Sequence, residues 1–213
     1  MTLSGTRPRQ ARAERTRSLI IETAARAFAE RGFDGVSLNE LVAATGMSKG
    51  AFYFHFSTKE EVALAAFRSK QVELIERLAV GVDGNADVVD QLTAILRRRA
   101  ELVSDDPSLH CVIRLGGELS PRSSPGSEYA SFMETASDTL AGLIRRGIRS
   151  GEFRRQLDAE ATARAIFAWI VGMDSLSLLD SAGKGLAQRT EEVLALIIPA
   201  LTAGPLRKER RRR

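Results

Sequence analysis

The chain has 213 residues, of which 44% are hydrophobic and 27% charged, and its formal net charge is +4. This composition suits one or two globular domains with sizeable cores, and no apolar run reaches the length of a membrane span. The first 17 residues are polar and Arg-rich, which excludes a secretory signal, and the single cysteine, Cys111, excludes an internal disulfide framework, so we expect a cytoplasmic protein.

The positive charge is concentrated at the two ends of the chain. Five arginines against one glutamate give residues 1–17 a net charge of +4, and residues 207–213 carry +5. The remainder therefore has a net charge of −5. Basic ends on a mildly acidic body favour local contact with a polyanion. We favour phosphate contact for residues 1–17 and a disordered, solvated tail for residues 207–213.

The first predicted elements are a disordered segment over residues 1–11 and a helix over residues 12–31. Apolar residues recur on one face of this helix at helical spacing. Gly32 ends the helix, and a short loop follows. The residues of the apolar face are Ile21, Ala24, Ala25 and Phe28.

Residues 37–59, SLNELVAATGMSKGAFYFHFSTK, predict two short helices joined by a tight turn, followed by the start of a third helix. Ser37 and Glu40 can form a capping box for the first helix, and Gly46 can adopt the positive φ that the turn needs. Ser48 can cap the second helix. Two short helices joined by a turn that contains glycine form a helix-turn-helix, whose second helix enters the DNA major groove.

The side chains of this stretch suit contact with duplex DNA. Small residues at the start of the second helix let its backbone approach the bases, and the hydroxyl, amine and imidazole groups around them are phosphate-contact types. The alternative is a small helical hairpin with a solvated basic edge, but caps, turn glycine and apolar spacing coincide here. The predicted DNA-binding residues are Ser37, Leu38, Ser48, Lys49, Gly50, Ala51, Tyr53, His55 and Lys59.

The string TGMSKGAFYFHFSTKEEV closely resembles the DNA-binding signature of TetR-family transcriptional regulators. Upstream, RAERTRSLIIETAARAFAERGFDGVSLNEL resembles the first helix and entry turn of that family. Within the family, RAERTR and KGAFYFHF most resemble the γ-butyrolactone autoregulator receptor branch. The resemblance covers about residues 12–70.

Six more helices are predicted after the helix-turn-helix. Ser57 and Glu60 are expected to form a second capping box where the first of them begins. Asp106-Pro107 and Ser124-Pro125 each indicate an N-cap followed by proline at the first helical position, and Asp158 can cap a later helix. The predicted ranges are 58–80, 86–104, 107–118, 125–149, 159–181 and 188–203.

No long stretch alternates apolar and polar residues, so we expect an all-α fold of about nine helices. Its predicted domains are a helix-turn-helix DNA-binding domain over residues 1–57, a larger helical ligand-binding and dimerisation domain over 58–206, and the basic tail. The helices over 159–181 and 188–203 are apolar nearly all round, so both need cover on several sides. A homodimer through these two helices supplies that cover, as the resemblance also implies; burial inside a monomer is the alternative.

The resemblance further implies a small-molecule pocket within the helical body and release of operator DNA when it fills. For each pocket candidate, the alternative is a satisfied core polar group or a surface residue. The function favoured is a dimeric repressor of a palindromic operator, released by a small, largely apolar molecule such as a γ-butyrolactone. The alternatives are a DNA-binding dimer without a ligand and a regulator of an efflux or metabolic gene that responds to an unrelated hydrophobic compound. The pocket candidates are Gln71, Arg99, His110, Arg114, Phe132, Trp169 and Met173.

Catalysis has little support in the sequence. The two histidines, His55 and His110, are far apart, and the adjacent His110 and Cys111 project about 100° apart on a helix, a poor arrangement for a nucleophile and its base. The sequence has no metal-ligand cluster and no Gly-rich phosphate loop, so we expect neither an enzyme nor a cofactor.

Overall fold

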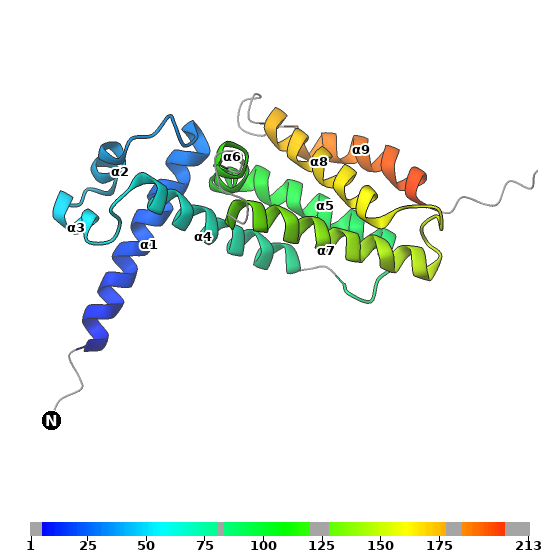
Figure 1. Ribbon diagram of the computed structural model, residues 1–213, viewed down its shortest axis with the longest axis horizontal. Coiled ribbons are helices and arrows are strands. Elements are labelled where there is room, and N and C mark those ends of the chain that lie inside the picture. Colours follow the sequence, from blue (N-terminus) through cyan, green and yellow to red (C-terminus); the bar gives the residue numbers. More distant parts are fainter. Residues whose placement is uncertain (1–5, 81–82, 120–127, 178–184, 203–213) are drawn as a thin grey trace, which may run out of the picture. The chain divides into compact units, whose positions relative to one another are not determined.

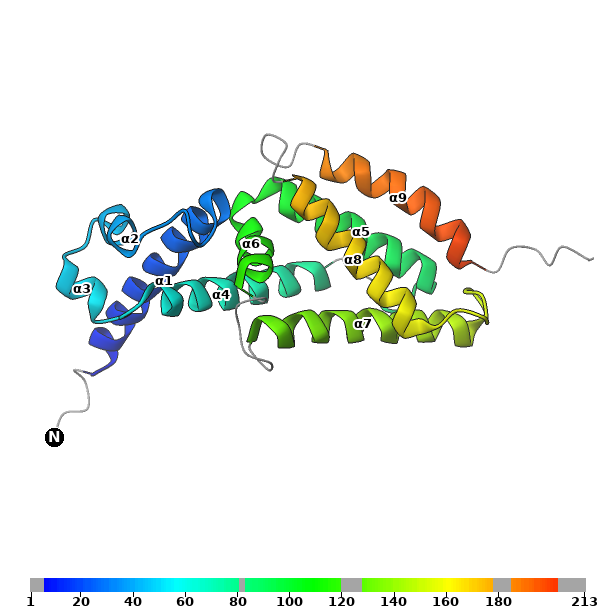
Figure 2. The same cartoon turned by 45° about the horizontal axis from the view of Figure 1, so that its top comes forward.

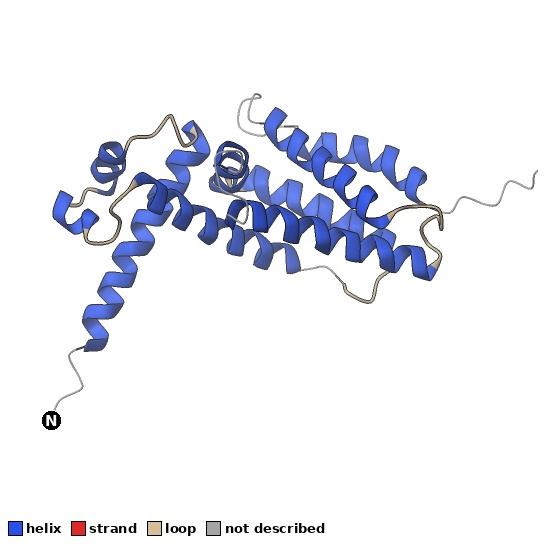
Figure 3. Ribbon diagram, in the orientation of Figure 1, coloured by secondary structure: helices blue, strands red, loops and turns tan. Residues whose placement is uncertain are grey.

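The computed structural model describes residues 6–80, 83–119, 128–177 and 185–202. Within these ranges the regular structure is helical, apart from one isolated β-bridge between Phe153 and Thr202 (Figure 3). The described part contains nine α-helices and one short 3-10 helix, which confirms the predicted all-α class. None of the described helices is long and apolar enough to cross a bilayer.

The chain folds into two compact units (Figure 1). The first consists of Met1–Glu76 and Asp106–Ser124, and the second of Arg77–Asp105 and Pro125–Arg213. This packing differs from the predicted domains, because residues 59–76 and 110–119 join the first unit. A functional division at residue 57 stays a prediction. The helices are α1 (Thr6–Arg31), α2 (Leu38–Thr45), α3 (Lys49–Tyr53), α4 (Lys59–Ala79), α5 (Val88–Asp105), η1 (Pro107–Leu109), α6 (His110–Leu119), α7 (Glu128–Ser150), α8 (Ala159–Ser177) and α9 (Leu186–Leu201).

In the first unit, the C-terminal half of α1 packs against α2, η1 and α6 (Figure 2). Phe28, Phe52 and Phe67 are fully buried there. Lys70 on α4 is also buried, and its ammonium lies 2.8 Å from the carboxylate of Glu22 on α1 and 2.9 Å from that of Glu73. Burial lowers the pKa of Lys70, but hydrogen bonds to the two carboxylates outweigh it, so the pKa is raised and the charge is kept.

The start of α1 departs from expectation. The helix begins at Thr6, so the predicted disorder over residues 1–11 is wrong for residues 6–11. Pro8 lies in the first turn, where a missing backbone N–H costs nothing, and the arginines, glutamine and alanine that follow are good helix formers.

The start of α4 is capped one residue later than predicted. Thr58 Oγ1 accepts a hydrogen bond from Glu61 N at 3.1 Å, and the Glu61 carboxylate accepts one from Ser57 N at 2.7 Å. The expected pairing of Ser57 with Glu60 is therefore wrong, because the helix begins at Lys59 and its third residue is Glu61.

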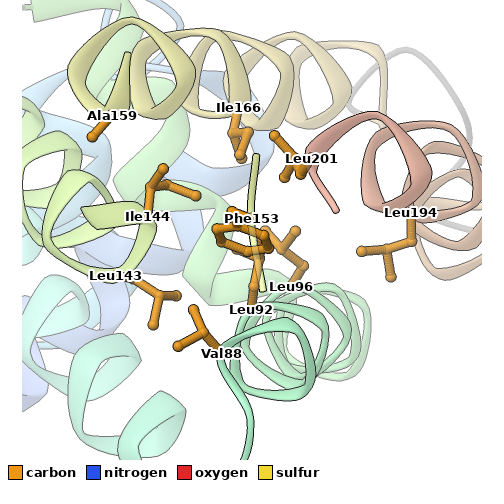
Figure 4. Close-up of a cluster of buried hydrophobic side chains, with 10 residues drawn as sticks. All are labelled: Val88, Leu92, Leu96, Leu143, Ile144, Phe153, Ala159, Ile166, Leu194 and Leu201. Atoms are coloured by element: carbon orange, nitrogen blue, oxygen red, sulfur yellow. The ribbon is translucent and has the colours of Figure 1, made fainter. Parts of the chain in front are cut away.

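The second unit packs α7 on α8, α5 on α9, and α5 on α7 around one apolar core. Figure 4 shows Phe153 in the middle of this core, with side chains from all four helices around it. Phe153 N donates to Gly147 O at 3.0 Å, which folds the turn after α7 back onto the helix. Glu152 in the same turn accepts a hydrogen bond from Val89 N at 3.1 Å, close to the start of α5.

The later helix boundaries are close to those predicted. Asp158 caps α8 as expected and accepts a 2.8 Å hydrogen bond from Ala161 N. Asp106 likewise caps η1, ahead of α6. The helix α9 begins at Leu186, two residues earlier than predicted, and includes Pro199. The predicted Ser124-Pro125 cap and the basic tail over 207–213 lie outside the described residues.

Candidate nucleic-acid interface

The helix-turn-helix is fixed by local hydrogen bonds. Ser37 Oγ accepts from Glu40 N at 3.2 Å, and the Glu40 carboxylate accepts from Ser37 N at 2.7 Å, which confirms the predicted capping box. Gly46 has a φ of +66° and donates its N–H to Ala43 O at 3.1 Å, so the turn glycine has the predicted conformation. Ser48 caps α3 by accepting from Ala51 N at 3.3 Å.

Glu40 adds electrostatic support to the start of α2. Hydrogen bonds from Ser37 and from Arg31, whose guanidinium lies 2.7 Å away, lower the pKa of this carboxyl to about 2. Glu40 therefore stays ionised at neutral pH, and its charge lies at the helix end that favours anions. The capping box of Ser37 and Glu40 therefore stabilises the start of α2, and no side chain of α3 takes part in it.

Apolar side chains hold α3 against the rest of the first unit. Phe52 and Phe56 are buried with their ring centroids 6.5 Å apart, and the guanidinium of Arg17 lies 5.0 Å from the centre of the Phe56 ring. The opposite side of α3 is open to solvent. Phe54, which follows α3 directly, is 80% exposed and has the His55 ring edge-on at 5.1 Å.

Most of the predicted DNA-binding residues lie at the open side of the helix-turn-helix. The caps Ser37 and Ser48 are exposed, while Leu38 and His55 are half-buried. Both serine hydroxyls are engaged as caps. The residues of α3 predicted to contact DNA are all exposed, and they are Lys49, Gly50, Ala51 and Tyr53.

Lys59, which is predicted to contact phosphate, is engaged by groups of its own unit. Its ammonium donates to Phe33 O at 3.0 Å and to Val36 O at 3.1 Å, and it lies 4.0 Å from the centre of the Phe33 ring. Lys59 thus ties the start of α4 to the loop before α2. The sequence offered no signal for this role, because the partners are backbone carbonyls more than 20 positions away.

The predicted ligand residues divide between the two units. Gln71, His110 and Arg114 belong to the first unit, where His110 is buried and the other two are half-buried. His110 Nδ1 lies 3.2 Å from Pro107 O, so part of its ring is engaged within its own turn. A depression of about 360 Å³ on α7 and α8 has none of the seven candidates in its lining.

The candidates in the second unit lie on α5, α7 and α8. Arg99 donates two hydrogen bonds to the carboxylate of Asp174, one of them 2.8 Å long, and Asp174 is almost wholly buried. Sequence reasoning missed Asp174, although an acid in the apolar stretch of α8 was an available signal. Trp169 is half-buried against the core, Met173 is buried, and Phe132 is half-buried.

The capped helix-turn-helix and the helical second unit together define a transcriptional regulator that binds DNA. The family profile described as "Bacterial regulatory proteins, tetR family" matches residues 20–66, and the profile "Tetracyclin repressor-like, C-terminal domain" matches residues 86–194. The chain belongs to the TetR family of bacterial regulatory proteins. Members of this family are transcriptional regulators and not enzymes. They bind operator DNA as homodimers and respond to small molecules.

Individual relatives are similar over nearly the whole chain. The HTH-type transcriptional repressor AcnR of Corynebacterium glutamicum is 38% identical over 198 residues, which are 91% of this chain and 94% of that protein. The A-factor receptor protein of Streptomyces griseus is 26% identical over 195 residues, 91% of this chain and 66% of that protein. A solved structure of a γ-butyrolactone receptor is 25% identical, covers 91% of this chain and 90% of its own, and has a TM-score of 0.71.

Proposed function

We propose that the protein is a dimeric repressor that acts in the bacterial cytoplasm. It binds a two-fold symmetric operator through α3 and leaves it when a small, largely apolar molecule binds the helical body. The observation that carries this proposal is the first turn of α3, which is held by a Ser48 cap and leaves Lys49, Gly50 and Ala51 exposed. Backbone at such a turn can approach base edges closely, and the alanine methyl can meet a thymine methyl.

The proposed dimer joins α8 and α9 of two chains. On α8 a line of small residues is exposed, with Leu176 at its end, and on α9 Leu196 is 72% exposed. Small residues let helices approach closely, and an exposed apolar stripe of this length needs a partner. The exposed small residues of α8 are Ala161, Ala165, Ala168 and Gly172.

The proposed ligand is a small molecule with more apolar than charged surface. The guanidinium of Arg99 is already paired with the carboxylate of Asp174. Arg99 therefore has no unpaired positive charge to offer to the carboxylate of an acidic ligand. A γ-butyrolactone is the first molecule to test, because a γ-butyrolactone receptor is among the similar structures. The relatives also include a regulator of fatty acid metabolism, so an unrelated hydrophobic compound remains the second candidate.

Release requires that the ligand bind better to a conformation that does not fit the operator. The proposed lever is α4, which is continuous in sequence from the helix-turn-helix unit into the second unit. The coupling must be reciprocal, so operator DNA should weaken ligand binding by the factor by which ligand weakens operator binding.

The test is a footprint on the DNA upstream of this protein's own coding region, supplemented by selection from random DNA. We expect a protected two-fold symmetric site with half-sites about one turn, or roughly 34 Å, apart. Tyr53→Ala should weaken binding to that site at least about tenfold and leave the oligomeric state unchanged. Binding of this variant at wild-type affinity would refute the placement of α3 on the DNA.

A further inference from the structure

Glu118 on α6 makes a hydrogen bond to the loop that enters the helix-turn-helix. Its carboxylate accepts from Phe33 N at 2.6 Å, although the two residues are 85 positions apart. Phe33 lies in the loop between α1 and α2, ahead of the N-cap Ser37. Figure 2 shows α6 beside the C-terminal end of α1, against which it packs. The contact therefore joins the helix-turn-helix to a helix that is not part of it.

The residues around this hydrogen bond are suited to the close approach of the carboxylate. A Cβ added to Gly32 would overlap the carboxylate of Glu118, so the position requires glycine. Gly32 also has a φ of +71°, which other residues adopt only at a cost. Phe33 is buried with its ring stacked on that of Phe28 on α1, and this packing keeps its backbone N–H directed at Glu118.

The backbone of Phe33 is held by two helices at once. Its N–H is bonded to Glu118 on α6, and its carbonyl accepts from the Lys59 ammonium on α4 at 3.0 Å. Lys59 also donates to Val36 O at 3.1 Å, one residue before the N-cap Ser37. A hydrogen bond that lengthens by about 1 Å is lost. A shift of that size between α4 and α6 therefore releases the loop from one of the two helices.

The helix α6 is directly linked in sequence to the second unit. Asp105, the last residue of α5, belongs to the second unit, and Asp106 begins the second segment of the first unit. Asp106 caps η1, and α6 begins immediately after η1, at His110. Only this capped turn separates α5 from α6, so a displacement of the end of α5 moves α6 as well.

We propose that Glu118 positions the helix-turn-helix for operator binding and makes operator affinity depend on the position of α6. Glu118 acts on the DNA through the loop at Phe33 and does not touch it, so it is a positioning residue. The inference rests on the proposed operator binding and adds a second route of control beside α4. A ligand or partner that moves α6 away from the loop lowers the fraction of chains competent to bind, and the apparent operator affinity falls with that fraction.

The test compares Glu118→Ala with the wild-type dimer on an operator selected from random DNA by the wild-type protein. The variant loses the bond between α6 and the loop, so we expect operator affinity to fall at least about fivefold, with the oligomeric state unchanged in sedimentation velocity. Glu118→Gln keeps an acceptor oxygen without the charge and should retain part of the affinity. Glu134→Ala removes a carboxylate from an exposed position of the second unit and should bind as the wild type does.

Amide hydrogen exchange separates positioning from a purely structural role. Coupling between two sites is reciprocal, so operator binding to the wild-type protein should slow exchange in residues 110–119, although α6 lies outside the helix-turn-helix. Glu118→Ala should lose this protection when it is compared at the same operator occupancy, which a higher protein concentration restores.

The outcomes distinguish this proposal from the function on which it rests. Wild-type operator affinity in Glu118→Ala overturns it, as does protection of α6 that persists in the variant or is absent from the wild-type protein. If Glu118→Ala does not fold, the same comparisons made with Glu118→Gln decide the question. Each of these results leaves operator binding intact, whereas a wild-type protein that binds no specific sequence overturns the proposed function as well.

Discussion

Gly50 lies in a helix at a position where the protein itself does not need a glycine. A Cβ built there meets no atom within 4 Å, and its φ is not in the left-handed range. Glycine inside a helix costs about 1 kcal/mol relative to alanine, so the small size at this position is unexplained by folding. The proposed close approach of DNA to the first turn of α3 would account for the small residue.

Gly50→Ala should therefore separate stability from binding. We expect the free energy of unfolding to rise by up to about 1 kcal/mol in urea denaturation, while affinity for the selected operator falls. Gly46→Ala is the matched control. Its φ of +66° strains any other residue, so it should lower the free energy of unfolding by about 1–2 kcal/mol. Full operator affinity in Gly50→Ala would mean that the DNA does not reach this turn.

Lys59 and Lys49 show why residue type alone does not assign a role. Lys49 is the first residue of α3 and Lys59 is the first residue of α4, and both were expected to contact phosphate. Lys49 is exposed, whereas Lys59 is engaged by two backbone carbonyls and a ring. The difference comes from the path of a loop between α1 and α2, which sequence periodicity does not describe.

At the scale of elements, the sequence predicted best what depends on near neighbours. The capping box of α2 and the N-caps of α3, η1 and α8 each join residues two or three positions apart. The residues that form each cap can therefore be recognised within a few positions of the sequence. Pairings between elements were not predicted. Lys70 with Glu22 and Arg99 with Asp174 join residues 48 and 75 positions apart, and nothing local distinguishes these charges from solvated ones.

The end of α7 and the turn that follows it, GIRSGEF (residues 147–153), are another stretch whose physical basis appears only in the structure. A Cβ added to Gly147 would lie 2.3 Å from the ring of Phe153, which is fully buried. Backbone and ring must therefore touch for Phe153 to reach the core. Gly151 supplies the left-handed conformation, with a φ of +83°, that reverses the chain.

Gly147→Ala should therefore destabilise the second unit. The added methyl forces the Phe153 ring or α7 to shift, at a cost of about 1–3 kcal/mol in the free energy of unfolding. Gly142→Ala lies on the same helix, where an added Cβ meets nothing within 4 Å, and it should be neutral or stabilising. Urea denaturation followed by far-UV circular dichroism measures both. Equal stability of the two variants would show that the contact at Phe153 relaxes without cost.

At the scale of the whole molecule, binding a two-fold operator depends on two chains being held together. One helix-turn-helix contacts few base pairs, and linking two of them raises the overall affinity by about 10²–10⁴ through effective concentration alone. The strength of the dimer contact therefore controls operator occupancy as directly as any residue of α3. In the proposed α8–α9 dimer, exposed apolar residues make that contact, so it can be changed by mutation without disturbing the core.

Leu196→Arg tests the proposed dimer. The side chain is largely exposed in the single chain, so the substitution removes no core contact, but it places two unpaired charges in a two-fold α8–α9 interface. Sedimentation velocity should show a monomer, and operator affinity should fall at least about 100-fold, with the circular dichroism of the folded chain retained. Gln156→Arg adds the same charge at an exposed turn of the same unit and should remain dimeric. A dimeric Leu196→Arg protein would place the interface elsewhere, whereas a monomer with full operator affinity would show that a single helix-turn-helix suffices for binding.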